Sequence, residues 1–398
     1  MDIWFRPHRV AAPKACPYTR PHCRDVRLLS QQKQEAMPMS RKSCKVRNRV
    51  LGAMLCGVCA CAGASLPSAE VAEPTQREAL VSTQADKAVL LGAATTGSGR
   101  LVVVGERGLV LLSDNGGAHW RQVSAPVSVT LTAVRFAGEQ GVAVGHAGVV
   151  LTSNDNGEHW QQRLDGRKAA ELALAAAEAE GDQARIDSAR LMVEEGPDKP
   201  FLDAAIDANG HLLVVGAYGM IFASSDQGSI WTAWMDRLDN PDGLHLYSVR
   251  QRGDDLLVAG ERGLVLHSRD GGASFQRLDM SYKGSLFTAE LPADGGLVVA
   301  GLKGSLLRSV DGGSHWQRLE AADGASFTAS SLGADGTLYL VTQAGHVLAL
   351  DADQLVPLTH QDMPALNGIV PVNADSVVLL SNLGLTTLRL DRRTEGRQ

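Results

Sequence analysis

Residues 102–120 read VVVGERGLVLLSDNGGAHW, which is a short apolar run, a G-x-x-G turn, a second apolar run and an S-x-(D/N)-x-G-x-x-(W/F) phrase. The whole phrase recurs as VAVGHAGVVLTSNDNGEHW (142–160), LVVGAYGMIFASSDQGSIW (213–231), LVAGERGLVLHSRDGGASF (257–275) and VVAGLKGSLLRSVDGGSHW (298–316). Two weaker copies, at 339–350 and 378–390, keep the turn and lose the second phrase. The second glycine of the turn falls at residues 108, 148, 219, 263, 304, 345 and 384, so every step is close to forty residues except one of 71. The chain therefore contains seven copies of one unit.

Each copy is expected to form four β-strands. In the first copy the strand runs are 89–94, 101–104, 109–113 and 119–123, and a tight turn at 105–108 joins the second run to the third. Short β runs at this spacing, separated by turn residues, predict one antiparallel sheet per copy. Seven such units are typical of a seven-bladed β-propeller, which is an all-β fold. A solenoid or a sandwich is the alternative, and it is disfavoured because a ring of seven blades closes well.

Closure of the ring makes a prediction about the ends of the propeller, which spans 87–392 before a charged tail at 393–398. The last copy supplies only three strand runs, so its outer edge would be left unpaired. The segment 78–83 (EALVST) precedes the first copy and has no other partner in the repeat pattern. We therefore expect the N-terminal segment 65–86 to close the last blade by supplying its fourth strand.

The one long step between repeats contains an insertion at about 167–195, between blades two and three. Its sequence is rich in Ala, Glu and Leu and is interrupted at 181–182, which predicts a helical hairpin with arms near 167–180 and 182–194. An apolar stripe is formed by Leu172, Leu174, Ile186, Leu191 and Met192. The helix pair either caps a blade or docks a partner. Docking is favoured because the insertion emerges on the same face as the G-x-x-G turns.

Charge and cysteine are distributed unevenly along the 398 residues, whose formal net charge is −6. Residues 1–64 contain 12 Lys and Arg against 3 Asp and Glu, so the remainder carries a net charge of −15. Phosphate backbones repel a body this acidic, which disfavours nucleic-acid binding. All 6 cysteines precede residue 65. The rest of the chain therefore has no disulfide framework, no cysteine-ligated zinc and no thiol nucleophile.

The N-terminal region has the order of a secretory signal peptide. Residues 41–49 are strongly basic, 50–64 are uncharged and rich in small apolar residues, and an A-x-A-like site precedes Ser65. We assign 37–64 as the signal peptide and 1–36 as an over-extended gene start. A membrane anchor is disfavoured because this run is shorter than the ~20 residues that span a bilayer. A lipoprotein would need Cys61, but the residues before it make a poor lipobox. The expected location is the periplasm or another exported compartment.

The recurrent S-x-(D/N)-x-G-x-x-(W/F) phrase matches the Asp-box, also called the bacterial neuraminidase repeat. Its Ser and Asp side chains accept backbone N–H bonds inside a tight turn, and its glycine permits positive φ. We expect the aromatic ring to cover the gap to the next blade. A metal site is disfavoured because each box supplies at most one carboxylate. The box residues are Ser113, Asn115, Gly117 and Trp120; Ser153, Asp155, Gly157 and Trp160; Ser224, Asp226, Gly228 and Trp231; Ser268, Asp270, Gly272 and Phe275; and Ser309, Asp311, Gly313 and Trp316.

The G-x-x-G turns are expected to lie on the opposite face, close to the channel of the propeller. Their glycines have a structural explanation, whereas the two residues between them vary and can carry recognition. Taken singly, a Glu-Arg pair in a turn is equally well read as solvated charge. Taken together, basic residues from three turns form a cluster in an acidic protein. The candidate partner-binding residues are Arg107, Arg262, Lys303, Tyr218, His146, Glu106 and Glu261.

Five Asp-boxes with G-x-x-G hairpins at forty-residue spacing resemble the photosystem II assembly and stability factor family of seven-bladed propellers. The resemblance covers about residues 89–390 and implies a protein that binds a membrane-protein assembly intermediate through an arginine-rich patch. Only Arg107, Arg262 and Lys303 match that patch here, and the two box-free copies and the insertion depart from the pattern. The sequence shows no sign of a photosynthetic host. Relatives in non-photosynthetic bacteria are commonly found beside transporters of the resistance-nodulation-division type, so the resemblance implies an envelope transporter complex as partner.

The rival function is an exported glycoside hydrolase of the sialidase kind. That chemistry needs three arginines, a tyrosine nucleophile with an acidic partner, and an acid/base Asp. After the signal peptide the tyrosines are Tyr218, Tyr247, Tyr282 and Tyr339, and only Tyr218 lies at a hairpin tip. A binding protein for an unidentified small ligand is a third hypothesis. We favour a monomeric, non-catalytic assembly or accessory factor without cofactor or metal.

Overall fold

The structure is a computed structural model that describes residues 72–359, 361 and 363–390. These residues lie in the compact unit formed by 69–398. The predicted gene-start extension, the signal peptide and the charged tail lie outside the described residues.

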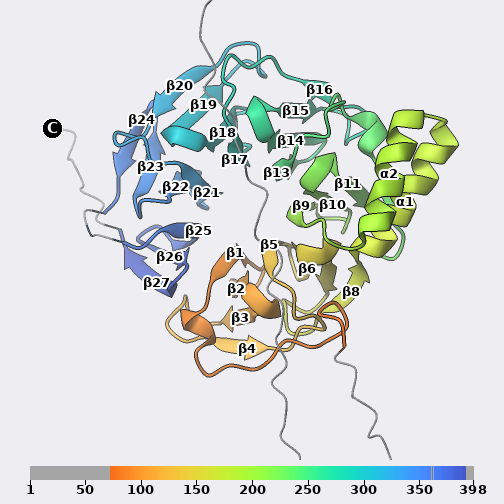
Figure 1. The fold of residues 1–398 in the computed structure, drawn as a ribbon. Helices are drawn as coiled ribbons and strands as arrows, with labels where there is room; N and C mark the ends of the chain where they lie inside the picture. The colour runs from red at the N-terminus through yellow and green to blue at the C-terminus, as the bar shows by residue number, and fades with distance from the viewer. Residues whose placement is uncertain (1–71, 360, 362, 391–398) are drawn as a thin grey trace, which may run out of the picture. The chain divides into compact units, whose positions relative to one another are not determined.

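Seven antiparallel sheets follow one another along the chain and form a ring, which Figure 1 shows from one end. Blades one to three comprise β1 (Leu90–Thr95), β2 (Leu101–Gly105), β3 (Val110–Ser113) and β4 (Arg121–Val123); β5 (Leu131–Ala137), β6 (Gln140–Gly145), β7 (Val150–Ser153) and β8 (Gln161–Leu164); and β9 (Phe201–Ile206), β10 (Leu212–Gly216), β11 (Ile221–Ser224) and β12 (Thr232–Ala233). Blades four and five comprise β13 (Leu246–Arg252), β14 (Asp255–Gly260), β15 (Val265–Ser268) and β16 (Gln276–Arg277); and β17 (Leu286–Glu290), β18 (Leu297–Gly301), β19 (Ser305–Ser309) and β20 (Gln317–Glu320). Blades six and seven comprise β21 (Phe327–Leu332), β22 (Leu338–Thr342), β23 (Val347–Asp351) and β24 (Gln354–Pro357); and β25 (Leu366–Asn373), β26 (Ser376–Ser381) and β27 (Gly384–Arg389). The predicted all-β, seven-bladed propeller is confirmed.

The second strand of each blade explains the long apolar runs of the repeat. In β2, β10, β14, β18 and β22 nearly every residue is buried, because each blade is packed between two neighbours and both of its faces are apolar. The core is accordingly a series of clusters between successive blades rather than a single centre. The first strands contact one another around the ring, and β25 contacts β1.

A bulge recurs near the start of the first strand in all seven blades, where the register shifts between the first and third residues. In three blades the side chain of the extra residue donates a hydrogen bond to the next blade. Thr132 Oγ1 donates to the carbonyl of Phe201 at 2.8 Å, and Thr328 Oγ1 donates to that of Leu366 at 2.7 Å. Asn367 Nδ2 donates to the carbonyl of Leu90 at 3.1 Å, so the seam that closes the ring uses the same contact.

The prediction that 78–83 forms the fourth strand of the last blade is wrong. Among the described residues the sheet of blade seven has only β25, β26 and β27, and the segment lies against β4 of blade one instead. The N–H of Ala79 donates to the carbonyl of Ala125 at 3.0 Å, and that of Ser82 donates to Gln122 Oε1 at 2.9 Å. The seam between blades seven and one is closed by apolar packing between their faces, including Ala85, so no exchanged strand is needed.

The helical hairpin is confirmed as α1 (Gly166–Glu180) and α2 (Gln183–Glu195), which stand at the edge of the ring beside blade three (Figure 1). Asp165 caps α1 by accepting the N–H of Lys168, and Asp182 caps α2 in the same way. The buried stripe differs from the expected one, because α1 packs through alanines whereas Leu191 is 52% exposed. No helix among the described residues is long and apolar enough to cross a membrane.

Candidate functional site: the hairpin-tip face

The G-x-x-G turns lie under the connections that lead to the next blade. A Cβ at Gly108 would be 2.1 Å from the carbonyl oxygen of Val127, and one at Gly384 would be 2.2 Å from that of Asp86. The first glycine is equally confined, since a Cβ at Gly105 would be 2.2 Å from the carbonyl oxygen of Val89. These contacts hold each turn at one position on the face that we call the hairpin-tip face.

The third residue of the turn adopts the left-handed conformation in five blades although it is not glycine. The values of φ are 54° at Arg107, 57° at Ala147, 55° at Tyr218, 54° at Arg262 and 55° at Lys303. Such a residue costs roughly 1 kcal/mol or more relative to an extended one. This strain is not predictable from the repeat pattern, because the position varies and carries no glycine.

The basic candidates are exposed at the surface. Arg107 and Lys303 are exposed, and the side chain of Arg262 is 71% exposed. Blades one and four lie on opposite sides of the ring, so Arg107 and Arg262 are separated by the channel mouth rather than joined in one cluster (Figure 1).

The two glutamates of the tips, Glu106 and Glu261, have a structural role. Glu106 Oε1 accepts the N–H of Val89 at 3.1 Å, and Glu261 Oε2 accepts that of His245 at 3.3 Å, so each fixes the loop that enters its own blade. The nearest approach of Glu261 to Arg262 is 3.8 Å, which is a weak exposed pair.

The tip residue Tyr218 forms a hydrogen bond and begins a series of aromatic contacts. Its ring is 59% exposed, and its N–H donates to His245 Nδ1 at 2.8 Å. An aromatic series continues from there toward the channel, with ring centroids 4.9 Å apart for Tyr218 and His245, 6.2 Å for His245 and Tyr247, and 5.3 Å for Tyr247 and Phe287. The tip candidate His146 is exposed, and its backbone N–H donates to the carbonyl of Thr130.

The channel opens between the first strands as a cavity of about 910 Å³. One residue from near the start of each first strand lines it: Leu91, Thr132, Leu202, Tyr247, Phe287, Thr328 and Asn367. At this level the two aromatic rings, Tyr247 and Phe287, come from the neighbouring blades four and five.

A chain of ion pairs runs along the channel wall from blade two to blade five, and a hydrogen bond extends it to blade six. Asp203 Oδ1 lies 2.7 Å from Arg135 Nη2, and Asp203 Oδ2 lies 2.6 Å from Arg250 Nη1. Arg250 continues to Glu290 at 3.3 Å, and Ser330 Oγ donates to Glu290 at 2.7 Å. Both carboxylates are buried and paired, so their role is to join neighbouring blades. Sequence reasoning missed them because each comes from a different repeat at a position with no consensus.

The Asp-boxes lie on the opposite face and are satisfied within their own turns. In blade two, Ser153 Oγ accepts the N–H of Gly157 at 3.0 Å and donates to Asp155 Oδ1 at 2.9 Å. Asp155 Oδ1 also accepts the N–H of His159 at 3.0 Å, and Trp160 Nε1 donates to the carbonyl of Gly157 at 2.9 Å. The other four boxes repeat the bonds from serine to glycine and from serine to Asp or Asn.

Hydrogen bonding also sets the protonation of the box carboxylates. The hydroxyl of Ser274, then its N–H and the hydroxyl of Ser268, lower the pKa of Asp270 to about 2. The N–H and ring of His315 hold the pKa of Asp311 well below its usual range. These carboxylates stay ionised and accept hydrogen bonds within their own turns, so their role is structural.

The box aromatic covers the preceding blade, whereas we expected the next one. Trp160 of blade two is 6% exposed and packs in the cluster that contains Val102 and Leu112 of blade one. Trp120 of blade one packs against Val378 of blade seven and so contributes to closing the ring.

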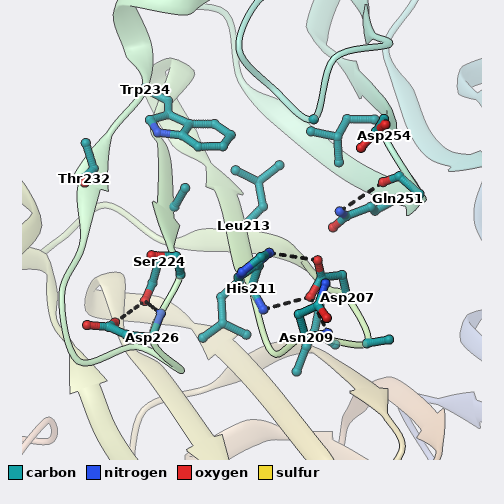
Figure 2. A pocket seen from close by; sticks show the side chains of 18 of the residues that line it. Asp207, Asn209, His211, Leu213, Ser224, Asp226, Thr232, Trp234, Gln251 and Asp254 are labelled. Carbon is teal, nitrogen blue, oxygen red and sulfur yellow. Dashed lines mark hydrogen bonds and ion pairs between the residues drawn. The ribbon is translucent and has the colours of Figure 1, made fainter.

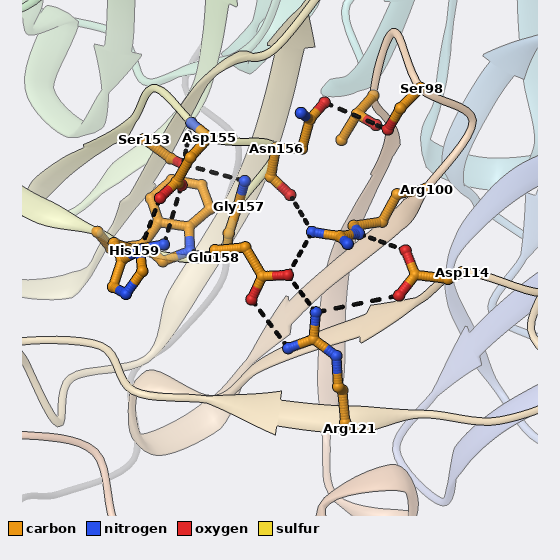
Figure 3. A network of polar contacts seen from close by, with 12 residues as sticks. Ser98, Arg100, Asp114, Arg121, Ser153, Asp155, Asn156, Gly157, Glu158 and His159 are labelled. Carbon is orange, nitrogen blue, oxygen red and sulfur yellow. Dashed lines mark hydrogen bonds and ion pairs between the residues drawn. The ribbon is translucent and has the colours of Figure 1, made fainter.

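An ion-pair network ties blades one and two together on the Asp-box face (Figure 3). Arg100 contacts Asp114 at 2.5 Å and Glu158 at 2.7 Å, and Arg121 forms a two-point contact with Glu158. The hydrogen bond from Arg121 is the main cause that holds the pKa of Glu158 below its ordinary value. The same seam gains a bond from Arg100 to the carbonyl of Asn156.

The corresponding seam between blades three and four is open on this face and holds a cleft of about 820 Å³. Figure 2 shows Trp234 and Leu213 in the cleft together with His211, which pairs with Asp207 at 2.9 Å. The cleft is large enough for a small ligand. It lies away from the hairpin tips, and only Ser224 and Asp226 of the predicted site residues line it.

A ring of seven blades with Asp-boxes on one face and confined hairpin tips on the other defines an Asp-box β-propeller. The family described as photosynthesis system II assembly factor YCF48 matches residues 78–180 and 186–288, which is more than half of the chain. The chain belongs to this family, which confirms the resemblance. Among curated proteins, none matches the sequence significantly.

Solved structures share the fold at low sequence identity. A structure described as YCF48 bound to D1 peptide is 16% identical with a TM-score of 0.57, over 78% of this chain and 98% of that chain. YCF48 from Cyanidioschyzon merolae is 14% identical with a TM-score of 0.57, over 79% of this chain and 98% of that chain. A GH74 enzyme from Niastella koreensis is 15% identical with a TM-score of 0.55, over 77% of this chain and 44% of that chain. The propeller is therefore common to binding proteins and enzymes, and it does not by itself decide between them.

Proposed function

We propose that this protein is an exported, non-catalytic propeller that helps to assemble or stabilise a membrane-protein complex of the cell envelope, with a resistance-nodulation-division type transporter as the candidate client. The observation that carries the proposal is membership of an assembly-factor family, one structure of which is described as bound to a D1 peptide. The basic, apolar and small-residue order of 37–64 supports export to the periplasm.

The hairpin-tip face is the surface that captures the client. Arg107, Arg262 and Lys303 project from turns that the backbone holds in place, so their charges are presented at fixed points around the channel mouth. A guanidinium pairs two carboxylate oxygens at once, which suits recognition of acidic groups on a protein partner. The exposed tip of Tyr218 adds an aromatic contact of the type enriched at interfaces.

The use of the polar groups in the channel supports a binding role over hydrolysis. The carboxylates that line the channel wall, Asp203 and Glu290, are both committed to arginine, and the tyrosine that lines it, Tyr247, is hydrogen-bonded to Ser285. A sialidase-like hydrolase would need a carboxylic acid free to exchange a proton beside its tyrosine nucleophile.

Quantitative proteomics of the cell envelope tests the function. Deleting the gene should lower the abundance of the subunits of one membrane-protein complex, and expressing the wild-type protein should restore them. Unchanged abundance of every envelope complex, or hydrolysis of chromogenic glycosides by the purified protein, would overturn the proposal.

A further inference from the structure

A groove of about 410 Å³ separates the helical hairpin from blade three. Ala173 and Ala177 of α1 and Met192 of α2 form one wall, and Met220, Met235 and Leu238 form the floor and the other wall. Ala173 also belongs to the core cluster that joins α1 to Met220 of blade three, so the groove lies beside this contact. Arg185 Nη2, which donates to the carbonyl of Met235 at 3.1 Å, bridges the two walls.

The polar groups along this apolar groove are predominantly acidic. Four carboxylates line it, from Glu180, Asp182, Asp236 and Asp239, against the single guanidinium of Arg185. Arg185 is already paired, at 3.0 Å from Glu180 and 3.7 Å from Asp182. Asp236 and Asp239 are exposed on the opposite rim. The rim therefore carries net negative charge and attracts cationic groups.

The groove is continuous with the hairpin-tip face. Tyr218 lines its mouth, and its exposed ring extends the apolar surface toward the channel. Glycines bring the two sides of the mouth together, since a Cβ at Gly219 would be 2.8 Å from Asn240 Nδ2. A segment that lies across Tyr218 can therefore insert a side chain into the groove.

We propose that this groove binds an apolar side chain from a segment of the client protein that is flanked by lysine or arginine. This proposal rests on the proposed function. The apolar side chain fills the alanine- and methionine-lined space, and the flanking cations lie against Asp236 and Asp239. The groove and the arginine tips then recognise segments of opposite charge, which fixes the orientation of the client on the face.

Three groove methionines provide a direct test in the purified mature protein. Their ¹³C-labelled methyl groups (Met192, Met220 and Met235) report binding, and Met280, which is 3% exposed between blades four and five, is the internal control. The probe is a short capped peptide with a central phenylalanine flanked by lysines. It should shift the groove methyls in a dose-dependent manner and leave Met280 unchanged. A peptide with flanking glutamates, or with glycine for the phenylalanine, should shift none of them. Equal shifts with all three peptides, or no shift with the lysine peptide, would overturn the proposal. Shifts of the same size with a small apolar amine would also overturn it, because the groove would then be a small-molecule site.

Variants separate the groove from the rest of the face. Removing both rim charges with Asp236→Asn and Asp239→Asn should weaken the lysine peptide about fivefold, whereas Asp254→Asn, an exposed control on the Asp-box face, should have no effect. Ala184→Trp, at an exposed position of α2 that lines the groove, should block the peptide without changing the melting temperature. Unaltered peptide binding by Ala184→Trp would overturn the groove assignment. If the groove variants retain the client and the arginine variants lose it, the groove assignment fails and the proposed function stands.

Discussion

At the residue scale, the turns of blade two show two different reasons for glycine. Some glycines are needed for positive φ alone, and others also because the backbone of another segment touches them. Gly138 and Gly148 share a φ of 62°, but a Cβ at Gly148 would lie 2.5 Å from the Cα of Gly166, whereas one at Gly138 would meet nothing within 4 Å. Close approach, rather than φ, is what holds the tips under the connections to the next blade.

This pair of glycines gives a matched test. Gly138→Ala should cost about 1 kcal/mol for the left-handed conformation. Gly148→Ala should cost roughly 1–3 kcal/mol more, because the start of α1 must move to admit the methyl group. Chemical denaturation of both variants measures the difference, and equal losses would mean that the tip is not confined by the connection above it.

The titration of Asp203 is the second residue-scale feature. Burial would raise the pKa of its carboxyl, but Arg135 and Arg250, together with the N–H groups of Ala204 and Val249, hold that pKa below its ordinary value. A carboxyl with a depressed pKa stabilises the fold above the pKa of the unfolded chain, and this stability is lost as pH falls through the folded value.

The variant Asp203→Asn should therefore cost about 3 kcal/mol at neutral pH, because it leaves the partly buried Arg135 without its carboxylate and Arg250 with Glu290 alone. The difference from wild type should shrink as the pH falls through the folded pKa of the carboxyl, which lies below its ordinary value. Denaturant titrations across this range measure it, with Asp254→Asn as the exposed control. A difference that stays constant as the pH falls would show that the charge of Asp203 does not stabilise the channel wall.

At the scale of elements, the seam between blades seven and one is the least regular. Blade seven has three strands among the described residues, yet the seam has the inter-blade bond from Asn367 and the packing of Trp120 against Val378. The N-terminal segment contributes mainly through the turn at Ala85–Lys87, against which Gly384 packs. Within 78–83, Ala79 packs into a core cluster of blades one and two, whereas Leu80 and Val81 are 80% and 83% exposed.

Two truncations test this account of closure, with a chain that starts at Ala72 as the control. A chain that starts at Gln84 should lose the few bonds to blade one and the buried methyl group of Ala79, about 1–2 kcal/mol, and remain monomeric. A chain that starts at Val89 also loses Ala85 from the seam and should aggregate. Thermal melting and light scattering distinguish them, and aggregation of the first truncation to the same extent as the second would restore the closing-strand hypothesis.

The repeat pattern predicted the elements well because each blade is encoded locally. The strands of blade one lie within two residues of the predicted runs, and the helical hairpin lies where the Ala-rich insertion indicated it. The inter-blade features were out of reach, because pairs such as Arg250 with Asp203 join positions that differ in every repeat. The left-handed conformation of Arg107 and the alanine-lined groove are likewise set by packing between segments distant in sequence.

At the scale of the whole molecule, the two faces have separate tasks. The Asp-box face holds the blades together through satisfied turns and buried rings such as Trp160. The hairpin-tip face presents exposed, strained residues that contribute little packing, such as Arg107 and Arg262. Ala147 occupies the same left-handed position in blade two, so alanine is accommodated there without rearrangement of the turn.

Binding of the client by the double variant Arg107→Ala and Arg262→Ala, measured beside its melting temperature, tests the central claim most directly. The variant should lose client capture, since a buried interfacial arginine contributes about 2 kcal/mol or more, while its melting temperature stays that of wild type. Trp160→Ala on the opposite face should have the opposite effect. It should lose about 3–5 kcal/mol of stability and still capture the client at temperatures where it is folded. Undiminished client binding by the double arginine variant would contradict the assignment of the hairpin-tip arginines as the capture site.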